Sequence, residues 1–233
     1  MAIAGTREAL RRLFFQRCFH FFVLLLALIA VAPFLEPLSE GALIMSAINS
    51  FLIVSAVAAV GRSIVSFVVA TVLAAPALYF HWKMAQTGDL TYQDLWLRCD
   101  LVLYGVTIFF LMRYVFDRGV MTSDRLSGAA AAFLLMGVMW AFIFTIIMRS
   151  DPLAFSSGGV RGPMPFMDVM YFSFITITTL GYGDILPVSR AARTAALLEA
   201  IIGQLFIAIL IAKLVGVYPQ HRDDQGRNQA FPS

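Results

Sequence analysis

The sequence predicts an all-α membrane protein, with six transmembrane helices and one shorter re-entrant helix that leads into a loop. Of the 233 residues, 60% are hydrophobic and only 13% are charged, and the mean hydropathy is +0.83. Soluble domains are typically about half apolar and about a quarter charged, so the composition indicates an integral membrane protein. Six apolar segments have spanning length: 19–35, 42–60, 64–82, 95–116, 127–148 and 190–215.

The two chain ends are predicted to be cytoplasmic, over residues 1–18 and 217–233. Residues 1–17 hold four arginines against one acidic residue, Glu8, and such clusters flank the cytoplasmic side of a span. The last residues are short and polar and cannot form a core. Two alternatives stay open for the N-terminal segment. They are a signal peptide and an amphipathic helix on the inner leaflet with Leu10, Leu13 and Phe14 on one face.

The first four apolar segments are predicted to form a peripheral domain over residues 19–126. A very tight turn at 61–63 joins the second segment to the third, and Arg113, Arg118 and Arg125 cluster before the fifth. Arginine-rich connections favour the cytoplasmic side. The protein is therefore predicted to cross the cell membrane (inner or plasma membrane) with both termini inside.

Residues 127–216 are predicted to form a second domain. The fifth segment opens with Gly128 and four alanines, and small residues let helices approach closely in lipid. The connection over 149–165 is rich in glycine and proline and is predicted to be an exposed outer turret. A short helix is predicted over 165–177, and the last span starts at Arg190.

Residues 178–184, Thr-Thr-Leu-Gly-Tyr-Gly-Asp, form the most informative stretch of the chain. Gly181 and Gly183 can take backbone angles that are barred to other residues, so successive carbonyl groups can turn to the same side. A row of carbonyls that faces one axis replaces the water around a bare cation, and the Thr179 hydroxyl can add to it. Irregular backbone at membrane depth survives where it is buried or lines a water-filled path. A cation path is therefore predicted here.

This stretch resembles the selectivity filter of potassium channels, whose loop reads Thr-Val-Gly-Tyr-Gly. The resemblance covers roughly the last half of the chain, and it implies a pore helix, a filter loop and an inner helix. Leu180 stands where valine is usual, but either residue contributes a carbonyl, so little change in selectivity is expected. The resemblance implies that the filter binds K⁺ through Thr179, Leu180, Gly181, Tyr182 and Gly183.

A further set of residues is predicted to support the filter. Ile175 stands where some channels carry an acidic partner for the aspartate after the filter, so Asp184 needs another partner. Positions 171 and 172 are those at which the family has aromatic residues around the filter tyrosine, and ordinary core packing is the alternative. The predicted supports are Tyr171, Phe172, Thr178, Asp184 and Glu199.

Glu199 lies inside the last span, and an intramembrane acid is a functional candidate by default. We expect it to bond a hydroxyl of the pore helix, from Ser173 or Thr176. The alternative is an ion pair with Arg190 or Arg193 near the outer surface.

Four more residues of the spans carry predictions. Gly203 is predicted to be a gating hinge of the inner helix, with close packing against the pore helix as the alternative. Lys213 is expected to extend to the inner surface. A voltage sensor needs several arginines on one helix face, whereas the fourth span has only Arg98 and Arg113, near opposite ends. The channel is therefore predicted to be voltage-insensitive.

The sequence thus predicts a potassium-selective channel subunit that conducts K⁺ passively through a filter formed by a homotetramer. One chain offers one filter strand, so a closed ring needs several chains. K⁺ is the permeant ion, and no cofactor, nucleic-acid partner or small-molecule ligand is evident. Hydrolytic residue sets and metal-ligand spacings are missing from the sequence, so no enzyme is predicted. The alternatives are a weakly selective cation channel and a non-conducting accessory subunit.

Overall fold

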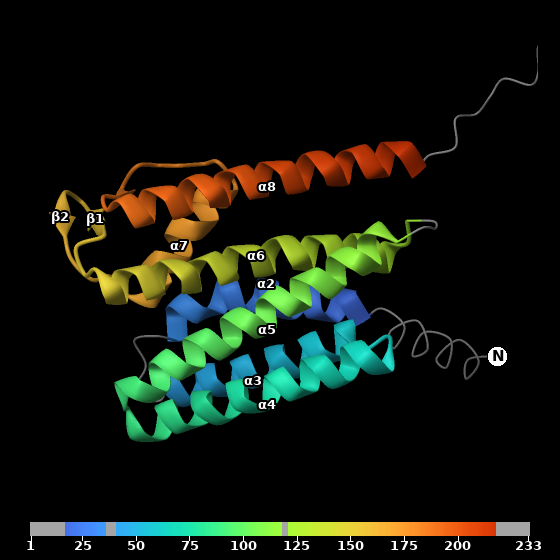
Figure 1. Cartoon of the computed structure of the whole chain (residues 1–233), viewed down its shortest axis with the longest axis horizontal. Helices are drawn as coiled ribbons and strands as arrows, with labels where there is room; N and C mark the ends of the chain where they lie inside the picture. The colour runs from blue at the N-terminus through green and yellow to red at the C-terminus, as the bar shows by residue number, and fades with distance from the viewer. Residues whose placement is uncertain (1–16, 36–40, 118–120, 218–233) are drawn as a thin grey trace, which may run out of the picture.

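The computed structural model describes residues 17–35, 41–117 and 121–217, and these are mostly helical (Figure 1). The predicted segments 1–18 and 217–233 lie almost entirely outside this part of the chain. In chain order the elements are α2 (Arg17–Leu35), α3 (Gly41–Val60), α4 (Ile64–Thr87), α5 (Leu90–Phe116), α6 (Ser123–Ser150), β1 (Phe155–Ser157), β2 (Val160–Arg161), α7 (Phe166–Ile177), β3 (Ile185–Pro187) and α8 (Arg190–Val217).

Five helices of the described residues are long and apolar enough to cross a membrane, namely α2, α4, α5, α6 and α8. Helix α3 has 20 residues, but the apolar stretch identified in it runs only from Ser46 to Val60. Helix α7 has 12 residues, too few for a bilayer crossing. The chain is a multi-pass membrane protein, and the sixth span stays a prediction.

Local sequence signals explain how α4 ends and α5 begins. Gly88 ends α4 with φ at 66°, a left-handed conformation that glycine adopts without a Cβ clash. Asp89 then accepts a hydrogen bond from the Thr91 backbone N–H at 2.8 Å and caps α5. At the other end of α4, Ser63 and Ser66 form a reciprocal capping box.

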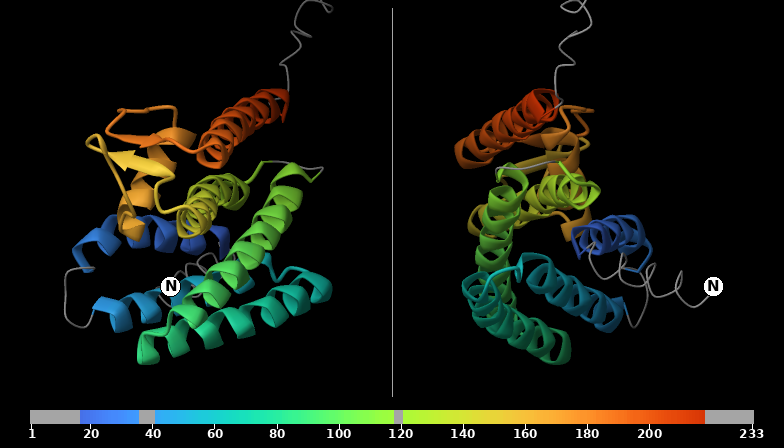
Figure 2. Two further views of the ribbon diagram at one scale, coloured as in Figure 1. Left: turned by 60° about the vertical axis from the view of Figure 1, so that its left-hand side comes forward. Right: turned by 90° about the vertical axis from the view of Figure 1, so that its right-hand side faces the viewer.

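Helix α6 occupies the centre of the arrangement (Figures 1 and 2). Helices α2 and α5 pack against it from one side and α7 and α8 from the other, while α3 and α4 lie further out. A Cβ atom added at Gly128 would lie 3.4 Å from the sulfur of Cys18 in α2. The small residues that open α6 therefore allow the close helix contact expected from them.

The connection after α6 is mostly exposed, as expected of a turret, but it also contains two short strands that the sequence did not predict. Strands β1 and β2 join β3 in a small sheet of order β2-β1-β3, in which Phe155 lies opposite Pro187 and Ser157 opposite Ile185. Phe155 is fully buried, with its ring 5.7 Å from that of Phe144. The sheet forms because an extended segment satisfies its backbone groups by pairing. The sheet holds in place the segment that directly follows residues 178–184, which we call the filter stretch.

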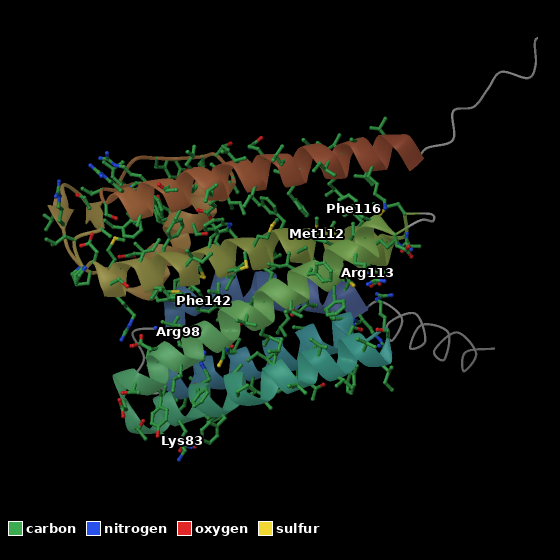
Figure 3. The ribbon with its side chains drawn as sticks, in the orientation of Figure 1. Lys83, Arg98, Met112, Arg113, Phe116 and Phe142 are labelled. Atoms are coloured by element: carbon green, nitrogen blue, oxygen red, sulfur yellow. The ribbon has the colours of Figure 1, made fainter. Side chains whose placement is uncertain are left out.

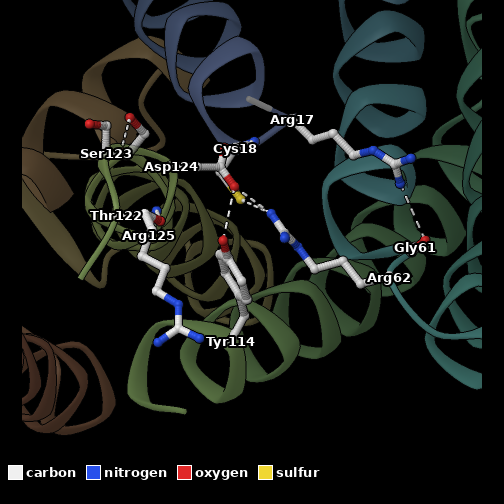
Figure 4. A network of polar contacts seen from close by, with 10 residues as sticks. Arg17, Cys18, Gly61, Arg62, Tyr114, Thr122, Ser123, Asp124 and Arg125 are labelled. Carbon is white, nitrogen blue, oxygen red and sulfur yellow. Dashed lines mark hydrogen bonds and ion pairs between the residues drawn. The ribbon is translucent and has the colours of Figure 1, made fainter. Parts of the chain in front are cut away.

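Asp124, at the start of α6, joins four elements at the end of the bundle away from the strands (Figure 4). Its carboxylate lies 2.5 Å from Nη2 of Arg62, which is in the turn between α3 and α4. It also accepts hydrogen bonds from the Cys18 backbone N–H at 3.0 Å and the Tyr114 hydroxyl at 3.1 Å. The arginines here were interpreted as orientation signals alone, but Arg62 also holds helix ends together.

Candidate functional site

The end of α7 sets where the filter stretch begins. Helix α7 packs between α6 and α8, and Thr178 ends it by donating from its hydroxyl to the Phe174 carbonyl oxygen at 2.6 Å. The Gly181 backbone N–H then donates back to the Ile175 carbonyl oxygen at 3.0 Å. Thr178 and Gly181 thus fold the stretch against the end of the helix.

The backbone of this stretch alternates between two conformations. φ is positive at Thr179 (60°), Gly181 (53°) and Gly183 (83°), while Leu180 and Tyr182 between them keep negative φ. Such alternation turns successive carbonyl groups toward the same side. A positive φ is a genuine outlier for a β-branched residue such as threonine, and strain of this kind gathers at functional sites.

The stretch is exposed in the single chain. Leu180 is 55% exposed and Tyr182 68%, and no atom lies within 4 Å of a Cβ built at Gly181 or Gly183. Gln204 of α8 reaches the Thr179 hydroxyl at 3.5 Å. One chain therefore lines only one side of any path that these residues face.

Asp184 has a partner that sequence reasoning did not identify. The Tyr171 hydroxyl of α7 donates to its carboxylate at 2.8 Å, and the Gly158 backbone N–H donates to its carbonyl oxygen at 3.1 Å. The neighbouring Phe172 is buried instead, with its ring 5.1 Å from Phe144 and 5.4 Å from Phe155. In this chain Phe172 has core contacts, as its alternative held, and Tyr171 makes a polar one.

Glu199 lies fully buried behind the filter stretch, against Ser173. Their side-chain oxygens are 2.5 Å apart, and the Ser173 hydroxyl also lies 2.7 Å from the Gly137 carbonyl oxygen of α6. Thr176, the other expected partner, bonds the Phe172 carbonyl within α7. Arg193 turns to the Pro187 carbonyl. Of the partners considered, Ser173 is the one that Glu199 meets.

Gly203 lies where α8 passes the end of α7. A Cβ added there would come within 2.6 Å of the Ile177 side chain and 2.8 Å of its carbonyl oxygen. The close-packing alternative is therefore present in the structure. Helix α8 runs without interruption through this point, and the hinge stays a prediction.

Arg113 lies in the last turn of α5, and Arg98 lies in the half of the helix that is nearer its other end (Figure 3). Both Arg98 and Arg113 are exposed. Lys213 of α8 donates to the Asp117 carbonyl oxygen at 3.1 Å, so it joins the end of α8 to the end of α5, and its extension to the inner surface stays a prediction.

Asp100, in the middle of α5, is a residue that sequence reasoning missed. It is fully buried and accepts a hydrogen bond from the Asn49 amide at 3.3 Å. The Asn49 side-chain oxygen accepts in turn from the Tyr104 hydroxyl at 3.0 Å. The detectable signal was an acidic residue inside the apolar segment 95–116, because such residues are costly in a membrane.

Comparison with known proteins finds similarity in the second half of the chain. Residues 132–219 match the family model described as "Ion channel". Two pore potassium channel c of Oryza sativa subsp. japonica is 35% identical over 85 residues, which are 34% of this chain and 19% of that protein. Potassium voltage-gated channel subfamily A member 2 of Xenopus laevis is 29% identical over 100 residues, 41% of this chain and 20% of that protein. The Mus musculus protein of the same name matches to the same extent.

The chain spans about a fifth of the length of the curated relatives that it matches. No solved structure matches it significantly. The family match extends from within α6 to the end of α8 and so includes the filter stretch. These findings point to a channel and not to an enzyme. The part of the chain from within α6 to the end of α8 is therefore similar to ion channels, and the relatives that match it are potassium channels.

Proposed function

We propose that this chain is a subunit of a potassium-selective channel that conducts K⁺ passively. The observation that carries the proposal is the alternating backbone at Thr179, Gly181 and Gly183. Carbonyls turned to one side replace the hydration shell of the ion, here from residues 179–182, and the Thr179 hydroxyl closes the innermost site. Repulsion between ions in neighbouring sites moves them along.

Four chains would close the filter into a ring. Each chain supplies one filter strand, and identical chains that assemble with closed rotational symmetry bring equivalent strands around one axis. The exposure of Leu180 and Tyr182 supports this arrangement. Helix α8 also exposes large apolar side chains that neighbouring subunits or lipid would cover: Leu197, Leu198, Ile201, Ile202, Leu205 and Ile209.

The proposal includes six spans, with α3 as the second, in the cell membrane. Arg62, Arg113 and Arg125 gather at the end of the bundle away from the strands (Figures 3 and 4). Arginine clusters favour the cytoplasmic side. The strands and the mouth of the filter would then face outward, with both chain termini inside.

Glu199 would support the filter as a neutral hydrogen-bond donor. Ser173 carries one hydroxyl proton, but its oxygen lies within hydrogen-bond distance of both Gly137 and Glu199. A carbonyl only accepts, so when Ser173 donates to Gly137 it needs a donor in Glu199. A protonated carboxyl group supplies one without burying a charge. The inner, pore and outer helices are then linked behind the filter.

Flux into liposomes tests the proposal directly. Purified protein is reconstituted, and K⁺ and Na⁺ uptake are compared at matched gradients, with the reversal potential measured in planar bilayers. We expect K⁺ uptake to exceed Na⁺ uptake strongly, and the reversal potential to follow the K⁺ gradient. Equal uptake would indicate a weakly selective cation channel. A folded tetramer without flux would indicate an accessory subunit, and either result overturns the proposal.

A further inference from the structure

A cavity of about 250 Å³ lies between the peripheral helices and the helix that carries the filter stretch. Helices α2, α3, α4 and α5 form one part of its wall and α6 and α7 the other, including Phe142 (Figure 3). Of the described residues, none from 178 to 184 lines it. The cavity is therefore separate from the proposed ion path.

Most of the cavity wall is apolar, and several of its polar groups are already paired inside the protein. The Tyr104 hydroxyl donates to Asn49, and the Gln93 side-chain oxygen accepts from Arg149 at 2.8 Å. The Thr145 hydroxyl donates to a carbonyl of its own helix. These groups are satisfied without any occupant of the cavity.

Trp96 of α5 and His81 of α4 are different, because the described structure gives no hydrogen-bond partner to the indole N–H of Trp96 or to either ring nitrogen of His81. Trp96 offers only a donor, whereas His81, which is 9% exposed, offers two ring nitrogens. A neutral imidazole has one donor and one acceptor nitrogen, and burying both without partners costs free energy. A hydroxyl group both donates and accepts, so it can pair with whichever nitrogen faces the cavity.

The wall also defines the charge and size of the occupant. No Asp, Glu, Lys or Arg is among the described residues that line the cavity, so a charged molecule would find no counter-ion there. Apolar cavities of about 150 Å³ stay dry and accept benzene, and this one is larger. We propose that the cavity binds a neutral, mostly apolar molecule of one or two rings, whose hydroxyl group hydrogen-bonds His81.

Such an occupant would touch the helix that positions the filter. Phe166, Met167 and Met170 of α7 line the cavity, and α7 leads directly into Thr178. Methionine side chains adapt readily to a new neighbour. An effect of the ligand on conduction therefore rests on the proposed channel function, whereas binding itself does not.

Photolabelling of the full chain in nanodiscs tests the site. The probe is a phenol that carries an aryl diazirine, and its adducts are mapped by mass spectrometry. The competitors are 2-naphthol and 2-methylnaphthalene, which differ by a hydroxyl in place of a methyl group. The variants are His81→Leu and, as the matched control, His20→Leu on α2, which does not line the cavity.

We expect adducts on the lining segments of α4 and α7. In the wild type, 2-naphthol should compete better with the probe than 2-methylnaphthalene does. This preference for 2-naphthol should be about three- to tenfold larger in the wild type than in His81→Leu. The His20→Leu variant should keep the wild-type ratio. The two competitors enter the lipid to different extents, but this difference is the same for every variant measured in the same lipid, so it cancels in the comparison. If His81→Leu fails to fold, His81→Gln, which keeps a donor and an acceptor, takes its place and should retain part of the preference.

Adducts confined to lipid-facing residues would overturn the proposal, as would a naphthol preference unchanged by His81→Leu. A cavity that holds only water would give no competable labelling and would overturn it too. The readout needs no conduction. If the protein binds the probe but shows no K⁺ flux, the result contradicts the proposed function and leaves this site intact. If it conducts K⁺ but is not labelled, the result contradicts this site alone.

Discussion

Tyr171 and Asp184 are joined across the filter stretch by a 2.8 Å hydrogen bond from the phenol to the carboxylate. Tyr171 belongs to α7, which precedes the stretch, and Asp184 directly follows it. Strand β3 begins at the next residue and pairs with β1. The C-terminal end of the stretch is therefore held by a side-chain bond and by a strand.

Removing one oxygen tests this bond. We expect Tyr171→Phe to leave folding intact and to shorten the time for which K⁺ current persists during a sustained recording, because Asp184 loses its donor. The measurement is the current decay in planar bilayers. Phe172→Leu is the comparison, since Phe172 makes core contacts only, and it should lower thermal stability instead. Unchanged decay in Tyr171→Phe would mean that the bond does not support the filter.

Substitutions of Glu199 separate charge from hydrogen bonding. An amide donates as a neutral carboxyl group does, so Glu199→Gln should keep most of the stability and K⁺ flux. Glu199→Ala removes the donor and leaves Ser173 buried without it, at a cost of about 1–3 kcal/mol. Thermal unfolding and liposome flux are measured on both variants. A Gln variant as damaged as the Ala variant would show that Glu199 acts as an anion.

Gly181→Ala is expected to abolish K⁺ conduction while the subunits still assemble. Gly181 has φ at 53° with open space around it, so the penalty comes from the left-handed backbone, about 1–2 kcal/mol for alanine in each chain. Gly162→Ala is the control, because Gly162 also has open space but an ordinary φ. Flux and oligomer size are recorded together, and wild-type flux from assembled Gly181→Ala would contradict the carbonyl filter.

We expect movement of the peripheral helices in the electric field to contribute little to channel opening. Each charge that crosses the membrane supplies about 2.3 kcal/mol per 100 mV. Arg98 and Arg113 lie toward opposite ends of α5 (Figure 3), and we expect their long side chains to extend to the headgroups. Conductance is measured against voltage for the wild type and for the double variant with glutamine at both positions. Two shallow curves are expected. A steep wild-type curve that flattens in the variant would reveal a sensor.

Asp124→Ala should destabilise the end of the bundle away from the strands by about 1–3 kcal/mol, because it leaves the Tyr114 hydroxyl and Arg62 without this acceptor. Asp117→Ala is the matched control, since that side chain is 67% exposed, and a change within about 0.5 kcal/mol is expected there. Unfolding in one detergent is compared for both. Equal effects would argue against the network shown in Figure 4.

Much of the fold and of the candidate site follows from local sequence properties. Apolar runs predict the spans, because a lipid environment imposes its length on a helix. The two glycines at 181 and 183 predicted a loop of unusual backbone, and both have positive φ. The positive φ of Thr179 was not predicted, since nothing in a threonine favours it. The family matches support the same half of the chain.

Tertiary structure alone decided which distant residues meet. Asp184 meets Tyr171, Glu199 meets Ser173 and not the other expected partner Thr176, and His81 faces a cavity. The strand at Phe155–Ser157 also depends on its partner, because short extended segments form only where another segment satisfies their backbone groups. A sequence pattern reports the preferences of neighbouring residues. Which buried donor reaches which acceptor is determined by how the helices pack, and that packing sums contacts from the whole chain.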